Sequence, residues 1–134
     1  MVTPMLETDF QDKVMRKLRT LPFSHWEKIN DSVSIGVLDV YGTIRGRAVV
    51  LELKTTSRLS KRQLSNLQKY ERAKAFTFAV DPKNWNEVFR YLAAVTANLH
   101  QFHEMPERYP ARLLPAKRKT RERNAPGYTR KERF

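Results

Sequence analysis

Three charged residues interrupt apolar segments of the sequence, and their side chains suit the chemistry of phosphodiester hydrolysis. Asp39 stands in the segment 35–40, and Glu52 and Lys54 stand in the segment 49–54. Side chains of an extended strand alternate between its two faces, so Glu52 and Lys54 project from one face and Leu53 from the other. A charged pair in such a strand must lie near its end, be paired, or hold a metal.

Asp39 and Glu52 lie opposite each other if the two segments form a hairpin. Two carboxylates at that separation repel each other unless one is protonated or a cation bridges them. A hard divalent cation, Mg²⁺ or Mn²⁺, prefers such oxygen ligands and polarises a phosphodiester oxygen, while Lys54 orients the attacking water and offsets the developing charge. In a simpler interpretation, Glu52 and Lys54 only pair with each other, and Asp39 caps a turn.

The net charge of the 134-residue chain favours a polyanionic partner. The chain has 26 Lys and Arg against 14 Asp and Glu, a net charge of +12. Residues 112–134 alone hold nine basic and two acidic residues. Such a surplus attracts nucleic acid, although acidic proteins and anionic membranes attract it too. The candidate phosphate contacts are Arg58, Lys61, Arg62, Lys117, Arg118, Lys119, Arg121 and Arg123.

Composition excludes several other classes of protein. The chain has no cysteine, which excludes disulfides, thiol catalysis and thiolate metal sites. We expect no organic cofactor. No signal peptide or membrane-spanning segment is recognisable, so we expect an intracellular, cytoplasmic protein.

Periodicity predicts the elements that position these residues. Apolar spacing predicts an amphipathic helix over 6–21, and β-branched residues predict strands over 32–41 and 47–54. The connection over 41–46 is a hairpin whose two glycines can take positive φ. The expected buried face of the first helix is Leu6, Phe10, Val14, Leu18 and Leu21.

The second half of the chain is predicted to form a helix, a strand and another helix. Ser60 and Gln63 form a capping box that opens a helix, a strand covers 74–80, and Asn84 caps a last helix. The second helix is expected to bury Leu64, Leu67 and Ala73, and the last helix Trp85, Val88, Phe89, Leu92, Val95 and Leu99. This order predicts an α/β domain over 1–104 with a mixed sheet flanked by helices, followed by a basic, partly disordered tail over 105–134.

The pattern resembles the PD-(D/E)xK nuclease superfamily, in which an acidic residue on one strand precedes Glu-x-Lys on the next. The matching residues are Asp39 and, after twelve intervening residues, Glu52-Leu53-Lys54. The chain looks most like small members of the VRR-NUC and archaeal Holliday-junction-resolvase types. The resemblance covers residues 7–80 and departs from many members at Leu38, where they carry proline.

The resemblance implies a restriction-endonuclease-like core and two further site residues. Glu7 matches an additional acidic metal ligand on the first helix, and Gln63 matches a glutamine that borders the active site. Other roles stay open, since Glu7 suits the first turn of any helix and Gln63 completes the capping box. Asp9 and Asp12 are rivals to Glu7.

The resemblance also implies a function. We expect an Mg²⁺-dependent endodeoxyribonuclease acting on branched DNA such as Holliday junctions, in recombination, replication or repair. The compact size suits a nuclease of viral or mobile-element origin. A homodimer through the last helix is also expected. The alternative is a non-catalytic nucleic-acid-binding or packaging protein that uses the basic tail.

Overall fold

The computed structural model of the chain describes residues 6–30 and 36–117. Among them are three α-helices, four strands and two short 3₁₀ helices. In chain order these are α1 (Glu7–Leu18), β1 (Ser24–Lys28), β2 (Val40–Ile44), β3 (Arg47–Leu53), α2 (Lys61–Arg72), β4 (Phe76–Val80), α3 (Trp85–Thr96), η1 (His100–Phe102) and η2 (Ala111–Leu113).

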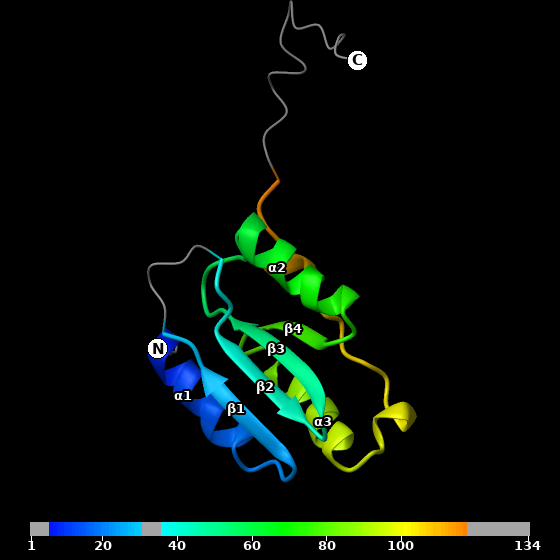
Figure 1. Cartoon of the computed structure of the whole chain (residues 1–134). Coiled ribbons are helices and arrows are strands. Elements are labelled where there is room, and N and C mark those ends of the chain that lie inside the picture. Colours follow the sequence, from blue (N-terminus) through cyan, green and yellow to red (C-terminus); the bar gives the residue numbers. More distant parts are fainter. Residues whose placement is uncertain (1–5, 31–35, 118–134) are drawn as a thin grey trace, which may run out of the picture.

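The four strands form one mixed sheet in the order β1-β2-β3-β4 (Figure 1). The first three strands pair antiparallel, and β4 pairs parallel to β3 after the crossover through α2. A parallel pair needs such a crossover, which here is a helix. The predicted α/β class, the mixed sheet and the order helix, strands, helix, strand, helix are therefore confirmed.

Helices cover both faces of the sheet. One face packs with α1 and α3 around a large apolar core that includes Phe10, Val14, Leu51, Phe78 and Leu92. The opposite face packs with α2 around a smaller cluster made of Leu38, Val50, Leu59, Leu67, Ala79 and Leu113. Successive residues of β3 thus enter different cores, and this alternation decides the face from which Glu52 projects.

The strands begin and end at different residues from those predicted. The segment around Trp26 forms β1, an element the periodicity did not reveal. The first expected strand, 32–41, is wrong in its bounds, because residues 36–39 are not in a strand and β2 runs through Ile44. Residues 32–35 lie outside the described ranges. The turn is confined to Arg45 and Gly46, both at positive φ, as in a two-residue hairpin.

Gly42 lies inside β2, so its expected place in the turn is wrong. A Cβ atom at Gly42 would lie 2.3 Å from Cε3 of Trp26 and 2.6 Å from the backbone oxygen of His25. The glycine therefore lets the buried indole of β1 lie flat on the neighbouring strand.

Three residues expected on the buried faces of the helices are exposed. Leu6 precedes α1 and Leu99 follows α3, so neither is held against the sheet. Ala73 is the C-cap of α2 and also faces solvent. Asn84 occupies the N-cap of α3, but its side chain makes no capping bond. Its Oδ1 atom instead accepts from the backbone N–H of Asp81.

Residues 105–117 pack against α2 and the outer edge of β4 (Figure 1). The backbone N–H of Ala79 donates to the carbonyl of Arg108, so this segment covers an edge that would otherwise be unpaired. Arg112 then binds the buried carboxylate of Asp81 through two hydrogen bonds of 2.9 and 3.0 Å. None of the helices in the described ranges is long and apolar enough to cross a membrane.

Replacement of Arg112 by alanine is expected to lower the free energy of unfolding by about 1–2 kcal/mol. The substitution leaves Asp81 buried without its bidentate partner, although the half-exposed guanidinium is partly screened by water. Urea denaturation measures the change. The exposed Arg72→Ala on α2 serves as the control, with a loss under about 0.5 kcal/mol. Equal losses in the two variants would show that the Arg112 contact does not hold the segment.

Candidate active site

The strand register brings the two predicted carboxylates together. Val40 pairs with Leu51, and the same register places Asp39 opposite Glu52 where β2 begins and β3 ends. The backbone N–H of Asp39 donates to Oε1 of Glu52 at 3.1 Å, and the N–H of Leu53 donates to Oδ2 of Asp39 at 2.9 Å. Each carboxylate thus binds the backbone of the other strand, which locks both at this end of the sheet.

Lys54 and Gln63 both contact the second oxygen of Glu52. The Nε2 atom of Gln63 donates to Oε2 at 2.9 Å, and Nζ of Lys54 lies 3.4 Å from the same oxygen. The backbone N–H of Lys54 donates to the carbonyl of Val80 at 2.8 Å, so the lysine is tied to the end of β4. The structure therefore gathers Asp39, Glu52, Lys54 and Gln63 at one point.

The capping box of α2 orients Gln63. Its backbone N–H donates to Oγ of Ser60, and its Oε1 atom accepts from the backbone N–H of Ser60 at 2.9 Å. With Oε1 held in this way, the amide nitrogen must point toward Glu52. The capping role and the role at the site, which the sequence left as alternatives, are thus compatible in one side chain.

Glu52 is buried in a way that disfavours its charge. Its exposed fraction is 3%. Burial, followed by the negative charge of Asp39, raises the pKa of Glu52 to about 8, and the opposing effect of Lys54 does not cancel this. A divalent cation between Asp39 and Glu52 would stabilise the charged form. The donor set therefore fits Mg²⁺ or Mn²⁺, with water or phosphate oxygens as the remaining ligands.

We expect the stability of the metal-free protein to fall as pH rises from about 4.5 to about 8. Over this window the unfolded chain releases the proton of Glu52 while the folded chain retains it. The decline from this group ends above about pH 8 and is on the order of 5 kcal/mol at most.

Urea denaturation in EDTA at several pH values measures this dependence. The Glu52→Gln variant cannot titrate at this position, so its unfolding free energy should lack this part of the decline. If the unfolding free energies of wild type and Glu52→Gln changed with pH in parallel, the burial of Glu52 would not cause the decline.

The structure does not gather Glu7 with the two carboxylates. Glu7 is exposed at the first turn of α1, where Nε2 of Gln11 lies 3.5 Å from its carboxylate. Within 6–30 and 36–117, no group of three or more acidic, histidine or cysteine side chains is arranged to hold a metal. Its rivals Asp9 and Asp12 are also exposed on α1. Glu7 as a metal ligand stays a prediction.

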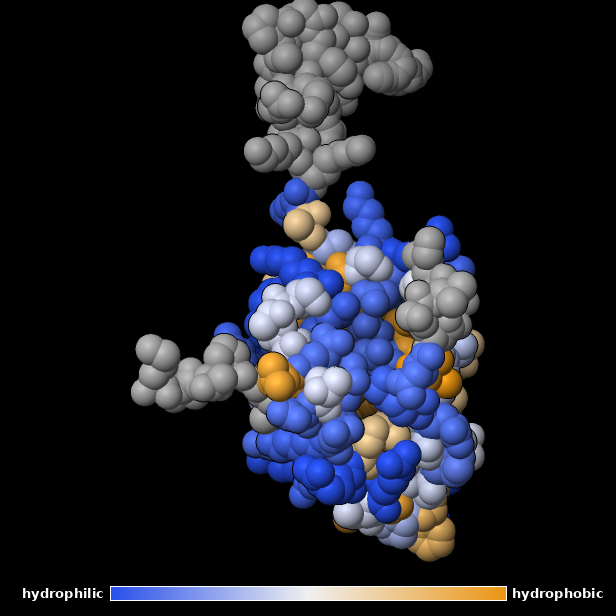
Figure 2. Space-filling model, turned by 90° about the vertical axis from the view of Figure 1, so that its left-hand side faces the viewer, coloured by the Kyte–Doolittle hydropathy of each residue, from blue (hydrophilic) through white to orange (hydrophobic). Residues whose placement is uncertain are grey.

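Basic side chains follow Lys54 along the chain. Arg58, Lys61 and Arg62 are exposed in the loop after Lys54 and the first turn of α2. Lys117 is exposed, and the other predicted contacts, Arg118, Lys119, Arg121 and Arg123, lie outside the described residues. Figure 2 shows the left-hand side of the view in Figure 1, and this face is mainly hydrophilic.

Tyr41 is a neighbour of the site that the sequence reasoning missed. Its hydroxyl oxygen accepts from the backbone N–H of Leu38 at 3.4 Å. Burial, followed by the nearby Tyr70 and Glu52, raises the pKa of Tyr41. The predicted strand over 32–41 places Tyr41 two residues after Asp39, which could have indicated that the two side chains share a face.

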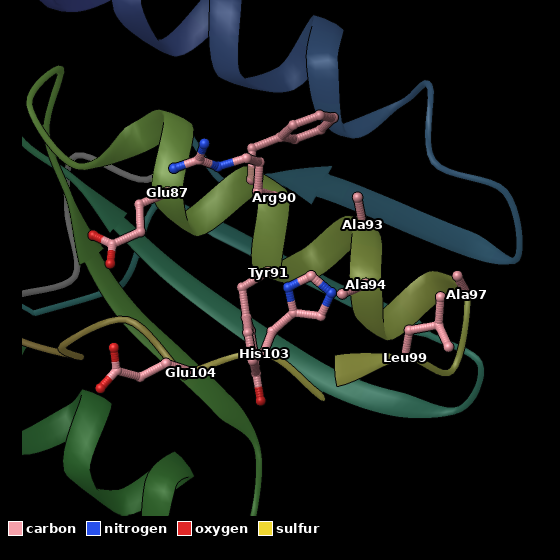
Figure 3. A pocket seen from close by; sticks show the side chains of 10 residues that line it. Glu87, Arg90, Tyr91, Ala93, Ala94, Ala97, Leu99, His103 and Glu104 are labelled. Carbon is pink, nitrogen blue, oxygen red and sulfur yellow. The ribbon is translucent and has the colours of Figure 1, made fainter. Parts of the chain in front are cut away.

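Another hollow lies away from this site. It measures about 650 Å³ and lies between α3 and the segment that follows it (Figure 3). Figure 3 shows His103 and Tyr91 lining it, with the carboxylates of Glu87 and Glu104 at one end. Because α3 covers the face of the sheet opposite α2, this hollow is separate from the acidic pair.

No family model, curated protein or solved structure matches this chain. The functional argument therefore depends on the geometry of Asp39, Glu52, Lys54 and Gln63.

Proposed function

We propose that the protein is a metal-dependent endonuclease that hydrolyses DNA phosphodiester bonds at this site. The observation that carries the proposal is the pair of Asp39 and the buried Glu52 at the shared end of β2 and β3, with Lys54 and Gln63 on the same oxygen of Glu52. A structural ion pair would need only Glu52 and Lys54. The opposed Asp39 makes a charged Glu52 costly without a cation, and a costly arrangement where two strands meet favours a functional role.

Each residue has a distinct role in the proposal. Asp39 and Glu52 hold Mg²⁺ or Mn²⁺, which supplies Lewis-acid polarisation of a phosphodiester oxygen and acidifies a bound water. Lys54 directs its ammonium group to the attacking water and to the charge that develops on the phosphate. Gln63 fixes the orientation of Glu52 and borders the path of the DNA.

The fold is consistent with the finer proposal of a restriction-endonuclease-like core in the PD-(D/E)xK superfamily. Three antiparallel strands precede a helix and a parallel fourth strand, and Glu-x-Lys spans the end of the inner strand β3. Asp39 directly precedes β2, opposite that motif.

Charge and chain path support DNA as the substrate. The net charge is +12, and basic side chains follow Lys54 directly along the chain. The backbone N–H of Leu59 donates to the carbonyl of Leu113, and Arg58 donates to the carbonyl of Leu114. The basic C-terminal segment therefore begins beside the loop that leaves the site, where it can contribute phosphate contacts.

The test is incubation of the purified protein with branched, linear and single-stranded DNA, in Mg²⁺ and in EDTA. Cutting in Mg²⁺ but not in EDTA supports the proposal, and a preference for the branched substrate supports a junction-resolving role in recombination, replication or repair. Binding of all three DNAs without any cutting would instead favour a nucleic-acid-binding or packaging protein. The homodimer stays a prediction.

A further inference from the structure

A second hollow lies on the same face of the sheet as Glu52, between α2 and the chain that enters β2. It measures about 420 Å³, which is within the range of pockets for small ligands. We call it the Tyr41–Tyr70 hollow. Its lining combines two phenol rings and small apolar groups with an amide and an ammonium group, from Val37, Tyr41, Asn66, Lys69, Tyr70 and Ala73.

The rings of Tyr41 and Tyr70 meet edge to face and form an aromatic corner. Their ring centroids are 5.7 Å apart and the rings are inclined by 68°, an edge-to-face arrangement. Such a pair leaves the face of one ring uncovered by the other, so a third planar ring can stack there. Tyr70 is 39% exposed, and the adjacent Lys69 also reaches solvent. The corner thus offers a stacking surface with a positive charge beside it.

The hollow is built onto the proposed active site. Tyr41 follows Asp39 by two residues, and its hydroxyl oxygen accepts from the backbone N–H of Leu38. Asn66 donates from Nδ2 to the carbonyl of Gly36 at 2.7 Å, which ties α2 to the segment that carries Asp39. A ligand in the hollow would therefore lie next to a phosphate held at Asp39 and Glu52.

We infer that the Tyr41–Tyr70 hollow receives the base of an unpaired nucleotide next to the scissile phosphate. The inference rests on the proposed nuclease function and deepens it by naming a class of substrate. A base inside a duplex is stacked on both sides and cannot enter a corner between a helix and a sheet, whereas an unpaired base can. Stacking on the tyrosine ring tolerates any base, and Lys69 lies where it can pair with the phosphate of that nucleotide.

The test compares two DNA duplexes that differ in one group. Both carry a single unpaired position, which holds a thymine in one duplex and an abasic sugar in the other. Fluorescence anisotropy in EDTA measures the Kd of each without cleavage. Wild type should bind the thymine duplex at least about tenfold more tightly. Equal binding of the two, or binding of neither, would overturn the inference.

Two substitutions at Tyr70 isolate the stacking surface. Tyr70→Ala removes the ring and should abolish the preference for thymine, whereas the matched Tyr70→Phe keeps the ring and should retain it. Ala73→Trp fills the hollow from an exposed position and removes no packing, so it should also abolish the preference. Retention of the preference in both Tyr70→Ala and Ala73→Trp would overturn the inference.

The outcome is separable from that of the nuclease proposal. A thymine preference in a protein that cuts no DNA would retain the hollow as a base-binding site and reject the catalysis. Metal-dependent cutting without any thymine preference would retain the catalysis and reject the hollow.

Discussion

Replacement of Lys54 by alanine is expected to slow metal-dependent DNA cleavage by about 10²–10³-fold. Only 12% of the Lys54 side chain is exposed, and its ammonium nitrogen lies 3.4 Å from Glu52, where the proposed reaction would develop charge. In so little water, a fixed positive charge stabilises an anionic transition state strongly. Single-turnover cleavage at saturating protein measures the loss, because this rate excludes differences in DNA affinity.

The control for Lys54 is Lys74→Gln. Lys74 is exposed in the turn before β4, at the opposite end of the sheet from the site, so its removal takes the same charge from the chain. We expect its cleavage rate to stay within about twofold of wild type, and circular dichroism should show both variants folded. Equal rates for Lys54→Ala and Lys74→Gln would contradict the role given to Lys54.

Addition of Mn²⁺ or Mg²⁺ at pH 8 is expected to raise the Tm of the wild-type protein by several degrees. A ligand that binds only the folded state adds about 3 kcal/mol of stability at about 100 times its Kd. The Tm increase should be smaller at pH 6, because below the pKa of about 8 a proton on Glu52 competes with the cation. Differential scanning calorimetry measures both conditions.

Asp39→Asn should remove most of this Tm increase. Asparagine retains an oxygen that can accept from the backbone N–H of Leu53, so the variant keeps the local fold while it loses a charged ligand. The Tm increase on addition of Ca²⁺, another hard divalent cation, shows whether the stabilisation depends on charge alone. A Tm increase of the same size in wild type and Asp39→Asn would mean that the cation binds elsewhere.

Local sequence signals predicted most of the fold. The capping box at Ser60 and Gln63 opens α2 where expected, because both of its hydrogen bonds are local in the chain. Alternation along 49–54 separates Leu53 from Glu52, because the two faces of β3 pack on different cores. The apolar spacing of the first helix and the apolar run of β4 were sufficient for the same reason.

Features that depend on contacts between distant segments were not predictable in this way. The strand at Trp26 pairs with β2 and lays its indole against Gly42, a contact between two segments that no periodicity in 24–28 records. The packing of residues 105–117 depends on Asp81 and Ala79, which are far away in the sequence.

The residues of the candidate site show the same difference between local signals and contacts of distant segments. Glu52 and Lys54 could be chosen from one strand alone, whereas the place of Asp39 needed the hairpin register that the structure supplies. Glu7 rested on resemblance alone, and its position on α1 depends on helix docking. Tyr41 could not be chosen from one strand, because its place in the hollow depends on the docking of Tyr70 from α2.

The most direct measurement is single-turnover cleavage of DNA by wild type and Asp39→Asn over the same Mg²⁺ titration, with DNA binding measured in EDTA. The proposed site predicts that wild type cuts in Mg²⁺ and stops in EDTA. It also predicts that Asp39→Asn binds DNA as wild type does but cuts at least about 10²-fold more slowly at every Mg²⁺ concentration. Cutting by Asp39→Asn at the wild-type rate would contradict the assignment of this pair of carboxylates as the catalytic centre.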